Sequence, residues 1–205
     1  MRQRFRHDGR AISYLEAVRP GPIQPRTLVL LHAFPVAAEM WLPQLAAVPA
    51  GWRFVAPDLR GFGASSLEPS DAGDRDDQAV SMDDYARDVV ALLDELEVDR
   101  AVIGGLSMGG YVAFALMRLA PERVRGLVLA DTRATADSAS ARAGRDAMIE
   151  TLSKGGVEAV WAKMLPGLLG ATNAGLPALV PEWKPQPPPW LSSTPQLDTF
   201  PQRKF

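Results

Sequence analysis

A single serine stands among glycines where one apolar segment of the sequence gives way to another. Ser107 lies in the run VIGGLSMGGY (residues 102–111), with glycines two positions before it and two positions after it. This G-x-S-x-G spacing is typical of a sharp turn between a strand and a helix, which exposes the serine hydroxyl as a nucleophile. The start of the helix would direct free N–H groups toward the reacting oxygen. The alternative is an ordinary tight turn, since such turns also collect glycine and serine.

The surroundings of Ser107 argue against other common glycine-rich sites. No Gly-Lys-Ser or Gly-Lys-Thr is present for a phosphate-binding loop, and the glycine spacing does not match a dinucleotide-binding loop. Cysteine is absent from the sequence, which excludes a cysteine nucleophile, a disulfide and a thiolate metal site. We therefore expect a serine-based site with no cofactor and no metal.

A second segment suited to the same chemistry follows an earlier apolar run. The sequence LLHAFP (residues 30–35) comes at the end of a predicted strand. Acyl transfer needs two N–H donors for the developing oxyanion, one from the residue after the nucleophile and one from an earlier loop of this kind. We expect the backbone N–H groups of Met108 and Phe34 to fill these two roles.

His32, in the same segment, has two possible roles. A histidine near a nucleophilic serine suggests a general base, but a triad base must approach Ser107 from the far side of the sheet. We favour the interpretation that His32 braces the oxyanion loop through hydrogen bonds and borders the substrate pocket. The general-base role is the alternative.

A third polar segment, DLRGFGASS (residues 58–66), follows the next predicted strand. Asp58, Arg60, Gly61 and Gly63 suit a tight loop at the carboxyl end of a parallel strand, which is the edge of the sheet where α/β proteins bind their ligands. Alone, this segment is an ordinary polar loop. Its position in the chain brings it to the same edge of the sheet as the serine turn.

Short apolar runs alternate with amphipathic segments along the first two thirds of the chain. Strands are predicted at residues 11–18, 27–32, 53–58, 100–105 and 124–131, and helices at residues 39–48, 81–98 and 108–120. Ser81 and Asp84 form a capping signature at the start of the second helix. This alternation predicts a doubly wound, mostly parallel α/β sheet.

Four segments occur in the order found in α/β-hydrolases. HAFP (residues 32–35), DLRGFGAS (58–65), GLSMGG (105–110) and LVLADT (127–132) resemble the family's oxyanion loop, the loop after the next strand, the nucleophile elbow and the strand that follows it. The likeness covers about residues 10–170 and is greatest to lactonases, esterases and cofactor-free haloperoxidases. It implies hydrolysis of small carboxylic esters or lactones through an acyl-enzyme on Ser107.

The resemblance also implies a division of the chain. Residues 1–138 would form the hydrolase core, and residues 139–170 would form two helices that begin a cap. Trp161, Met164 and Leu168 of this partial cap would contribute an apolar acyl pocket, although ordinary core packing explains them equally well. Residues 171–205 are dense in proline, which excludes a central strand, and are predicted to be an irregular tail.

The catalytic order of the family is serine, then acid, then histidine, and this order is incomplete here. The sequence has two histidines, His7 and His32, and both precede Ser107. Asp131, after the strand that follows the serine turn, is the candidate acid, and a carboxylate that caps the next turn is an equal alternative. We expect a shortened or frame-shifted, C-terminally incomplete member of the family with an exposed sheet edge.

Composition supplies the remaining expectations. The 205 residues are 47% hydrophobic and 22% charged, with a net charge of −2, which is typical of one globular domain. The balanced charge disfavours nucleic acid or an anionic membrane as a partner, and no apolar run reaches the length of a signal peptide or a membrane span. We expect a cytoplasmic protein that acts on a small-molecule ester or lactone. The alternative, favoured by the missing histidine, is a non-catalytic binding or remnant protein; the sequence does not specify an oligomeric state.

Overall fold

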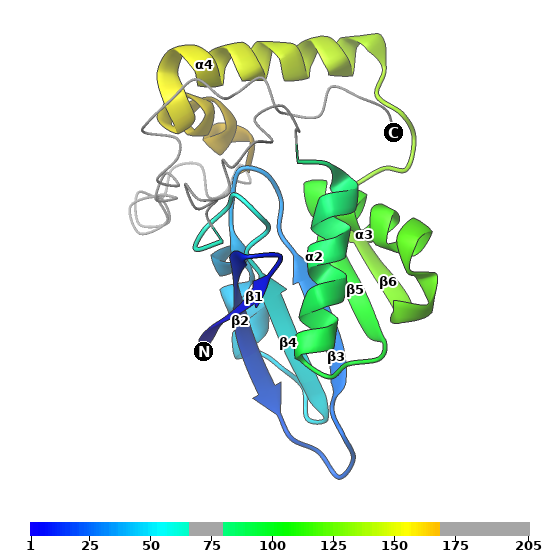
Figure 1. Cartoon of the computed structure of the whole chain (residues 1–205). Helices are drawn as coiled ribbons and strands as arrows, with labels where there is room; N and C mark the ends of the chain where they lie inside the picture. The colour runs from blue at the N-terminus through cyan, green and yellow to red at the C-terminus, as the bar shows by residue number, and fades with distance from the viewer. Residues whose placement is uncertain (66–79, 169–205) are drawn as a thin grey trace. The chain divides into compact units, whose positions relative to one another are not determined.

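The computed structural model describes residues 1–65 and 80–168 (Figure 1). Its first compact unit, Met1–Ala134, holds a six-stranded sheet with the strand order β1-β2-β4-β3-β5-β6. The strands are β1 (Arg2–His7), β2 (Arg10–Arg19), β3 (Arg26–Leu31), β4 (Trp52–Pro57), β5 (Ala101–Leu106) and β6 (Val124–Ala130).

The sheet is mixed, with its parallel part around the predicted site. Strands β4, β3, β5 and β6 are parallel neighbours, whereas β1 and β2 form an antiparallel hairpin and β2 pairs antiparallel with β4. The predicted doubly wound, mostly parallel α/β sheet is confirmed. Strand β1 is not predicted by the apolar pattern, because arginines alternate along it and only Phe5 is buried, facing Ile12 of β2 across the register.

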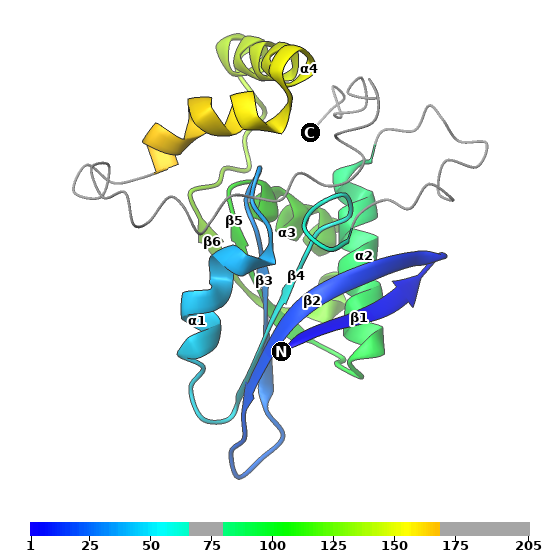
Figure 2. The same cartoon turned by 90° about the vertical axis from the view of Figure 1, so that its left-hand side faces the viewer.

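Helices cover both faces of the sheet (Figure 2). The 3-10 helix η1 (Ala38–Trp41) and helix α1 (Leu42–Ala46) lie on one face, and helices α2 (Met82–Glu95) and α3 (Met108–Leu119) lie on the other. The larger core lies under α2 and α3 and includes Val29, Leu31, Val89, Leu93, Ile103, Val112 and Leu116. Strands β3 and β5 each have a neighbouring strand on both sides. The loop after β3 and the turn after β5 therefore start from rigidly held backbone.

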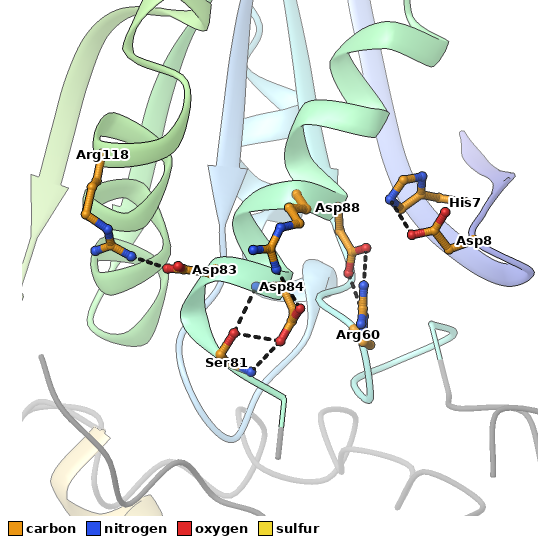
Figure 3. A network of polar contacts seen from close by, with 9 residues as sticks. His7, Asp8, Arg60, Ser81, Asp83, Asp84, Asp88 and Arg118 are labelled. Carbon is orange, nitrogen blue, oxygen red and sulfur yellow. Dashed lines mark hydrogen bonds and ion pairs between the residues drawn. The ribbon is translucent and has the colours of Figure 1, made fainter. Parts of the chain in front are cut away.

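Helix α2 begins as the sequence predicts. The Ser81 hydroxyl accepts from the Asp84 backbone N–H, and the Asp84 carboxylate accepts from the Ser81 backbone N–H at 2.8 Å, which completes a capping box (Figure 3). Its apolar stripe, with Val89, Leu92 and Leu93 buried, explains why the amphipathic pattern is so clear in the sequence. The helix ends at Glu95, three residues before the predicted end at Val98.

Strand β6 is the last strand of the sheet among the residues that the structure describes. Leu127, Val128 and Leu129 on this strand are 37%, 55% and 43% exposed. Consecutive residues of a strand point to opposite faces, so both faces of β6 carry exposed apolar side chains. Among the described residues, β6 pairs with β5 on one side and with no strand on its other side, where the sequence predicts an exposed edge.

Helix α4 (Ala139–Leu168) belongs to the second compact unit, which begins at Thr135. Its backbone leaves helical geometry at Gly156, with φ 65° and ψ −170°, so it consists of two helical segments, as predicted for residues 139–170. The predicted irregular tail, residues 171–205, lies outside the described residues. In the part of the chain that the structure describes, no helix combines the length and the apolar character needed to cross a bilayer.

Candidate active site

Ser107 occupies the turn that joins β5 to α3, as the glycine spacing predicts. Its backbone has φ 51° and ψ −111°, a conformation that residues with a side chain rarely adopt. The Ser107 side chain makes no capping hydrogen bond to α3, so its hydroxyl is not used by the start of its own helix. Strain of this kind persists only where the surrounding structure fixes it, and it is concentrated at functional sites.

Two glycines permit this turn because other backbone segments occupy the space of their missing side chains. A Cβ on Gly105 would lie 2.6 Å from the backbone nitrogen of Gly110, and a Cβ on Gly109 would lie 2.7 Å from the carbonyl carbon of Leu31. The first contact folds the turn onto the start of α3. The second brings the start of α3 against the end of β3, where the predicted oxyanion loop begins.

Hydrogen bonds fix the peptide groups of Ser107 on both sides. The Ser107 N–H donates to the Ala130 carbonyl oxygen at 3.0 Å, and the Ser107 carbonyl oxygen accepts from the Gly110 N–H at 3.0 Å and from the Thr132 hydroxyl at 2.9 Å. A Cβ on Gly110 would overlap the side chain of Thr132. Thr132, which follows β6, therefore helps to fix the backbone of the serine turn.

The segment that carries Phe34 follows β3 and lies next to this turn through the contact between Leu31 and Gly109. In the described chain the non-glycine residues with positive φ are Asp8, Glu97, Ser107 and Asp131. Ala33 is not among them, so its backbone lies outside the left-handed region that favours glycine. The Phe34 ring packs edge-on against Phe62, with ring centroids 6.2 Å apart.

His32 is completely buried, and both of its ring nitrogens are engaged. Nε2 accepts a hydrogen bond from the Leu59 N–H at 3.0 Å, which leaves Nδ1 to carry the proton and donate to the Ala33 carbonyl oxygen at 2.9 Å. Burial lowers the pKa of His32 to about 4, against the smaller opposing effects of its bond to Ala33 and the nearby charge of Asp58. These are the contacts of a brace, and they leave neither nitrogen to accept a proton from Ser107.

Asp131 follows β6 and is exposed, with φ 43°. It directly precedes Thr132, whose hydroxyl bonds to Ser107, so it lies on the segment that supports the serine turn. The two histidines of the sequence are His32, described above, and His7, which lies beside Asp8 at 3.4 Å in the β1–β2 hairpin (Figure 3). Neither is oriented by Asp131 in the described structure, so the acid role of Asp131 stays a prediction.

The loop after β4 contains polar residues whose partners the sequence does not reveal. Arg60 donates two hydrogen bonds to the carboxylate of Asp88 on α2, at 2.9 and 2.6 Å (Figure 3). Burial acts to lower the pKa of Arg60, but the hydrogen bond and charge of Asp88 outweigh it and leave this pKa raised. Asp58 is completely buried. The signal that could have identified Asp58 as a paired group is its position as a charged residue directly after a buried strand.

The predicted pocket residues of the cap belong to the second unit. Trp161 is 8% exposed and Met164 is partly buried, while the side chain of Leu168 lies outside the described residues. Their contact with a substrate stays a prediction. Among the residues that the structure describes, no group of three His, Cys, Asp or Glu side chains is arranged to hold a metal ion.

The fold and the site together define a class of protein. It is a doubly wound α/β protein that holds one serine on a strained strand-to-helix turn, with the end of a neighbouring parallel strand packed against the start of the helix that follows the serine.

The chain belongs to the alpha/beta hydrolase fold family, whose model matches residues 26–154. A thermophilic esterase from Thermogutta terrifontis is similar in structure, with a TM-score of 0.75 and 28% identity over 97% of this chain and 72% of that one. The enol-lactonase from Burkholderia xenovorans is similar with a TM-score of 0.65 and 25% identity, over 80% of this chain and 58% of that one.

Curated relatives include epoxide hydrolase 2 of Siraitia grosvenorii. It is 32% identical over 116 residues, which cover 56% of this chain and 34% of that protein. The chain spans about a third of the length of the first curated relatives that it matches. The family assignment therefore rests on residues 26–154, which contain strands β3 to β6, the serine turn and the loop after β3, and the candidate site lies in this segment.

Proposed function

We propose that the chain carries the nucleophile and the oxyanion-hole donors of a hydrolase that acts on small carboxylic esters or lactones. The observation that carries the proposal is Ser107, held with φ 51° between β5 and α3 by backbone contacts and by the Thr132 hydroxyl. The likeness to an esterase and an enol-lactonase supports this choice of substrate class. Oγ of Ser107 would attack the carbonyl carbon, and the ester C–O bond would break, so that the alcohol takes up the proton of the serine hydroxyl and the acyl group stays on Ser107; water would then hydrolyse this acyl-enzyme to the carboxylic acid and free Ser107.

The backbone N–H groups of Met108 and Phe34 are the proposed donors to the oxyanion. Met108 is the first residue of α3, where the helix presents N–H groups without partners inside the helix and the positive end of its dipole. Phe34 lies in the loop that begins beside Gly109. Removing one such donor costs about 10²–10³ in kcat in other acyl-transfer enzymes, so the placement of this loop matters for rate.

A second candidate function follows from the state of the histidines. Both histidines precede Ser107, and both nitrogens of His32 are engaged in hydrogen bonds. A serine hydroxyl without a general base is a weak nucleophile at neutral pH. A protein that binds an ester or lactone without turning it over, or a remnant of a hydrolase, is the function that this observation favours.

Steady-state hydrolysis of p-nitrophenyl butyrate by the purified chain, beside its Ser107→Ala variant, separates the two candidates. The hydrolase proposal predicts a rate that depends on Ser107, and a kcat below the ordinary range of about 1–10³ s⁻¹ because, among the described residues, no general base contacts Ser107. Acceleration of roughly 10³–10⁴ over water is the most that an oxyanion hole and binding supply without the complete triad. Equal rates for wild type and Ser107→Ala would refute the nucleophile and leave the binding function.

A further inference from the structure

The segment that runs from the end of β3 to the first residue of η1, residues 32–38, is held at both of its ends by two consecutive residues. At its start, His32 accepts the Leu59 N–H at 3.0 Å; at its end, the Ala38 N–H donates to Oδ1 of Asp58 at 2.9 Å. Asp58 and Leu59 directly follow β4, the strand beside β3 in the sheet. The loop that carries Phe34 is therefore attached at both of its ends to Asp58 and Leu59, the two residues that directly follow β4.

The other carboxylate oxygen of Asp58 is used as well. Oδ2 accepts from the Ala64 N–H at 3.0 Å and from Nη1 of Arg2 at 2.5 Å. A Cβ on Gly63 would lie 2.8 Å from the same oxygen, so the loop after β4 wraps tightly around the carboxylate. Asp58 is completely buried, and the guanidinium of Arg2 supplies the positive charge that a buried carboxylate needs.

We infer that Asp58 is a positioning residue for the oxyanion loop, acting through the Ala38 N–H to set the place of the Phe34 N–H. This inference rests on the proposed function, because it assigns Phe34 the donor role given there. The hydrogen bonds of the Asp58 carboxylate are with Ala38, Ala64 and Arg2, and not with Ser107. Asp58 fixes the end of the loop at Ala38, and His32 fixes its other end. The Phe34 N–H is thereby kept at hydrogen-bond distance from the developing oxyanion.

The chemistry of a carboxamide makes this inference testable with one nearly isosteric change. A carboxylate has two acceptor oxygens, and Asp58 uses Oδ1 for Ala38 and Oδ2 for Ala64 and Arg2. Asparagine has one acceptor oxygen and one NH₂ donor group. In Asp58→Asn the oxygen would face the two donors, one of them cationic, and the NH₂ group would face the Ala38 N–H. The substitution therefore detaches the end of the oxyanion loop in particular.

The matched control is Asp88→Asn. Asp88 is also a buried carboxylate paired with an arginine, and it also contacts the loop after β4, through Arg60. Its carboxylate accepts its hydrogen bonds from Arg60 and not from residues 32–38. Both variants are compared with wild type in two measurements on the full chain: hydrogen–deuterium exchange of peptides that cover residues 33–39, and global stability in urea, which corrects the exchange for overall unfolding.

The exchange measurement decides the positioning role independently of any activity. Asp58→Asn should increase exchange in residues 33–39 by about tenfold or more beyond the change that its global stability explains. Asp88→Asn should show no excess in this segment. Equal changes in the two variants, or protection of residues 33–39 that is unaltered in Asp58→Asn, would overturn the inference.

The kcat and KM for p-nitrophenyl butyrate distinguish a positioning role of Asp58 from a purely structural one. With rates corrected for the fraction of folded protein, Asp58→Asn should lower the Ser107-dependent kcat by about 10- to 100-fold with KM changed less than about threefold, because a misplaced donor weakens the transition state more than the substrate complex. A proportional loss in Asp88→Asn would contradict this. If the wild type shows no Ser107-dependent hydrolysis, the proposed function fails, and the exchange comparison still decides the position of the loop.

Discussion

Replacing Ser107 by glycine should make the protein more stable than replacing it by alanine. At φ 51° and ψ −111° the Ser107 backbone lies in a region that L residues avoid because of their Cβ atom. Alanine removes the hydroxyl but keeps the Cβ, whereas glycine removes both. The comparison of Ser107→Gly with Ser107→Ala therefore isolates the strain that the turn imposes on residue 107.

The expected magnitude follows from two opposing contributions. A residue held in such a region costs about 1–3 kcal/mol of strain. Glycine loses more backbone entropy on folding, which costs roughly 0.5–1 kcal/mol relative to alanine. The net difference in the free energy of unfolding is about 1 kcal/mol in favour of Ser107→Gly, with a range of about 0–2.5 kcal/mol set by these two contributions. This corresponds to a Tm higher by about 2–4 °C for each kcal/mol in a protein of this size.

Urea unfolding followed by circular dichroism measures this difference, with Arg87→Ala and Arg87→Gly as the control pair. Arg87 is an exposed residue inside α2, where glycine costs about 1 kcal/mol relative to alanine. The same pair of side chains should thus change stability in opposite directions at the two positions. If Ser107→Gly is the less stable variant by as much as Arg87→Gly is, the turn is not strained and the argument for a preorganised nucleophile fails.

Three further changes test other parts of the structure. Gly109→Ala should lower the free energy of unfolding by about 1–3 kcal/mol, because its Cβ would overlap the backbone of Leu31; in urea unfolding, Gly126→Ala on β6, where a Cβ meets nothing within 4 Å, should change it by less than about 1 kcal/mol. The folded-state pKa of His32 is lowered from 6.5 to about 4, so the unfolded chain binds the proton first, and stability should decrease as pH falls from about 6.5 to 4, by up to about 3 kcal/mol. In His32→Gln this part of the pH dependence should vanish, and an unchanged profile in urea titrations would contradict the buried, neutral state of His32. Val128→Lys should reduce self-association, measured by sedimentation velocity, and leave the circular dichroism spectrum unchanged, since Val128 is 55% exposed on the last described strand. Equal self-association of the wild type and the variant would show that the molecules do not associate through β6.

Much of the sheet is predictable from the sequence because local pattern and burial agree. The runs at β3, β4 and β5 are apolar and largely buried, as parallel strands inside a sheet require, and the Ser81–Asp84 pair marks the start of α2. The run at β6 has the same apolar pattern, although most of its side chains are exposed in the described chain. Strand β1 is the exception. Its arginines hide the strand pattern, and its one buried residue, Phe5, is too little to indicate a strand without knowledge of its partner β2.

The serine turn is predictable for a different reason, since glycines at fixed spacing report a backbone conformation directly. The contacts that make them necessary are not predictable, because they come from residues distant in sequence, such as Leu31 against Gly109 and Thr132 against Gly110. The same applies to Asp58, whose partners Arg2 and Ala38 lie 56 and 20 positions away. A pattern identifies a polar residue at the end of a strand, but only the folded chain shows which donors converge on its two oxygens.

Covalent trapping of Ser107 tests the central claim most directly. The purified chain is incubated with a p-nitrophenyl alkylphosphonate, which reacts with a serine held beside an oxyanion hole and releases p-nitrophenol, and the intact mass is followed with time. We predict a single phosphonyl adduct that maps to the peptide containing Ser107 and is absent from Ser107→Ala. An unmodified mass after prolonged incubation, or an adduct that forms equally in Ser107→Ala, would contradict the assignment of Ser107 as the nucleophile.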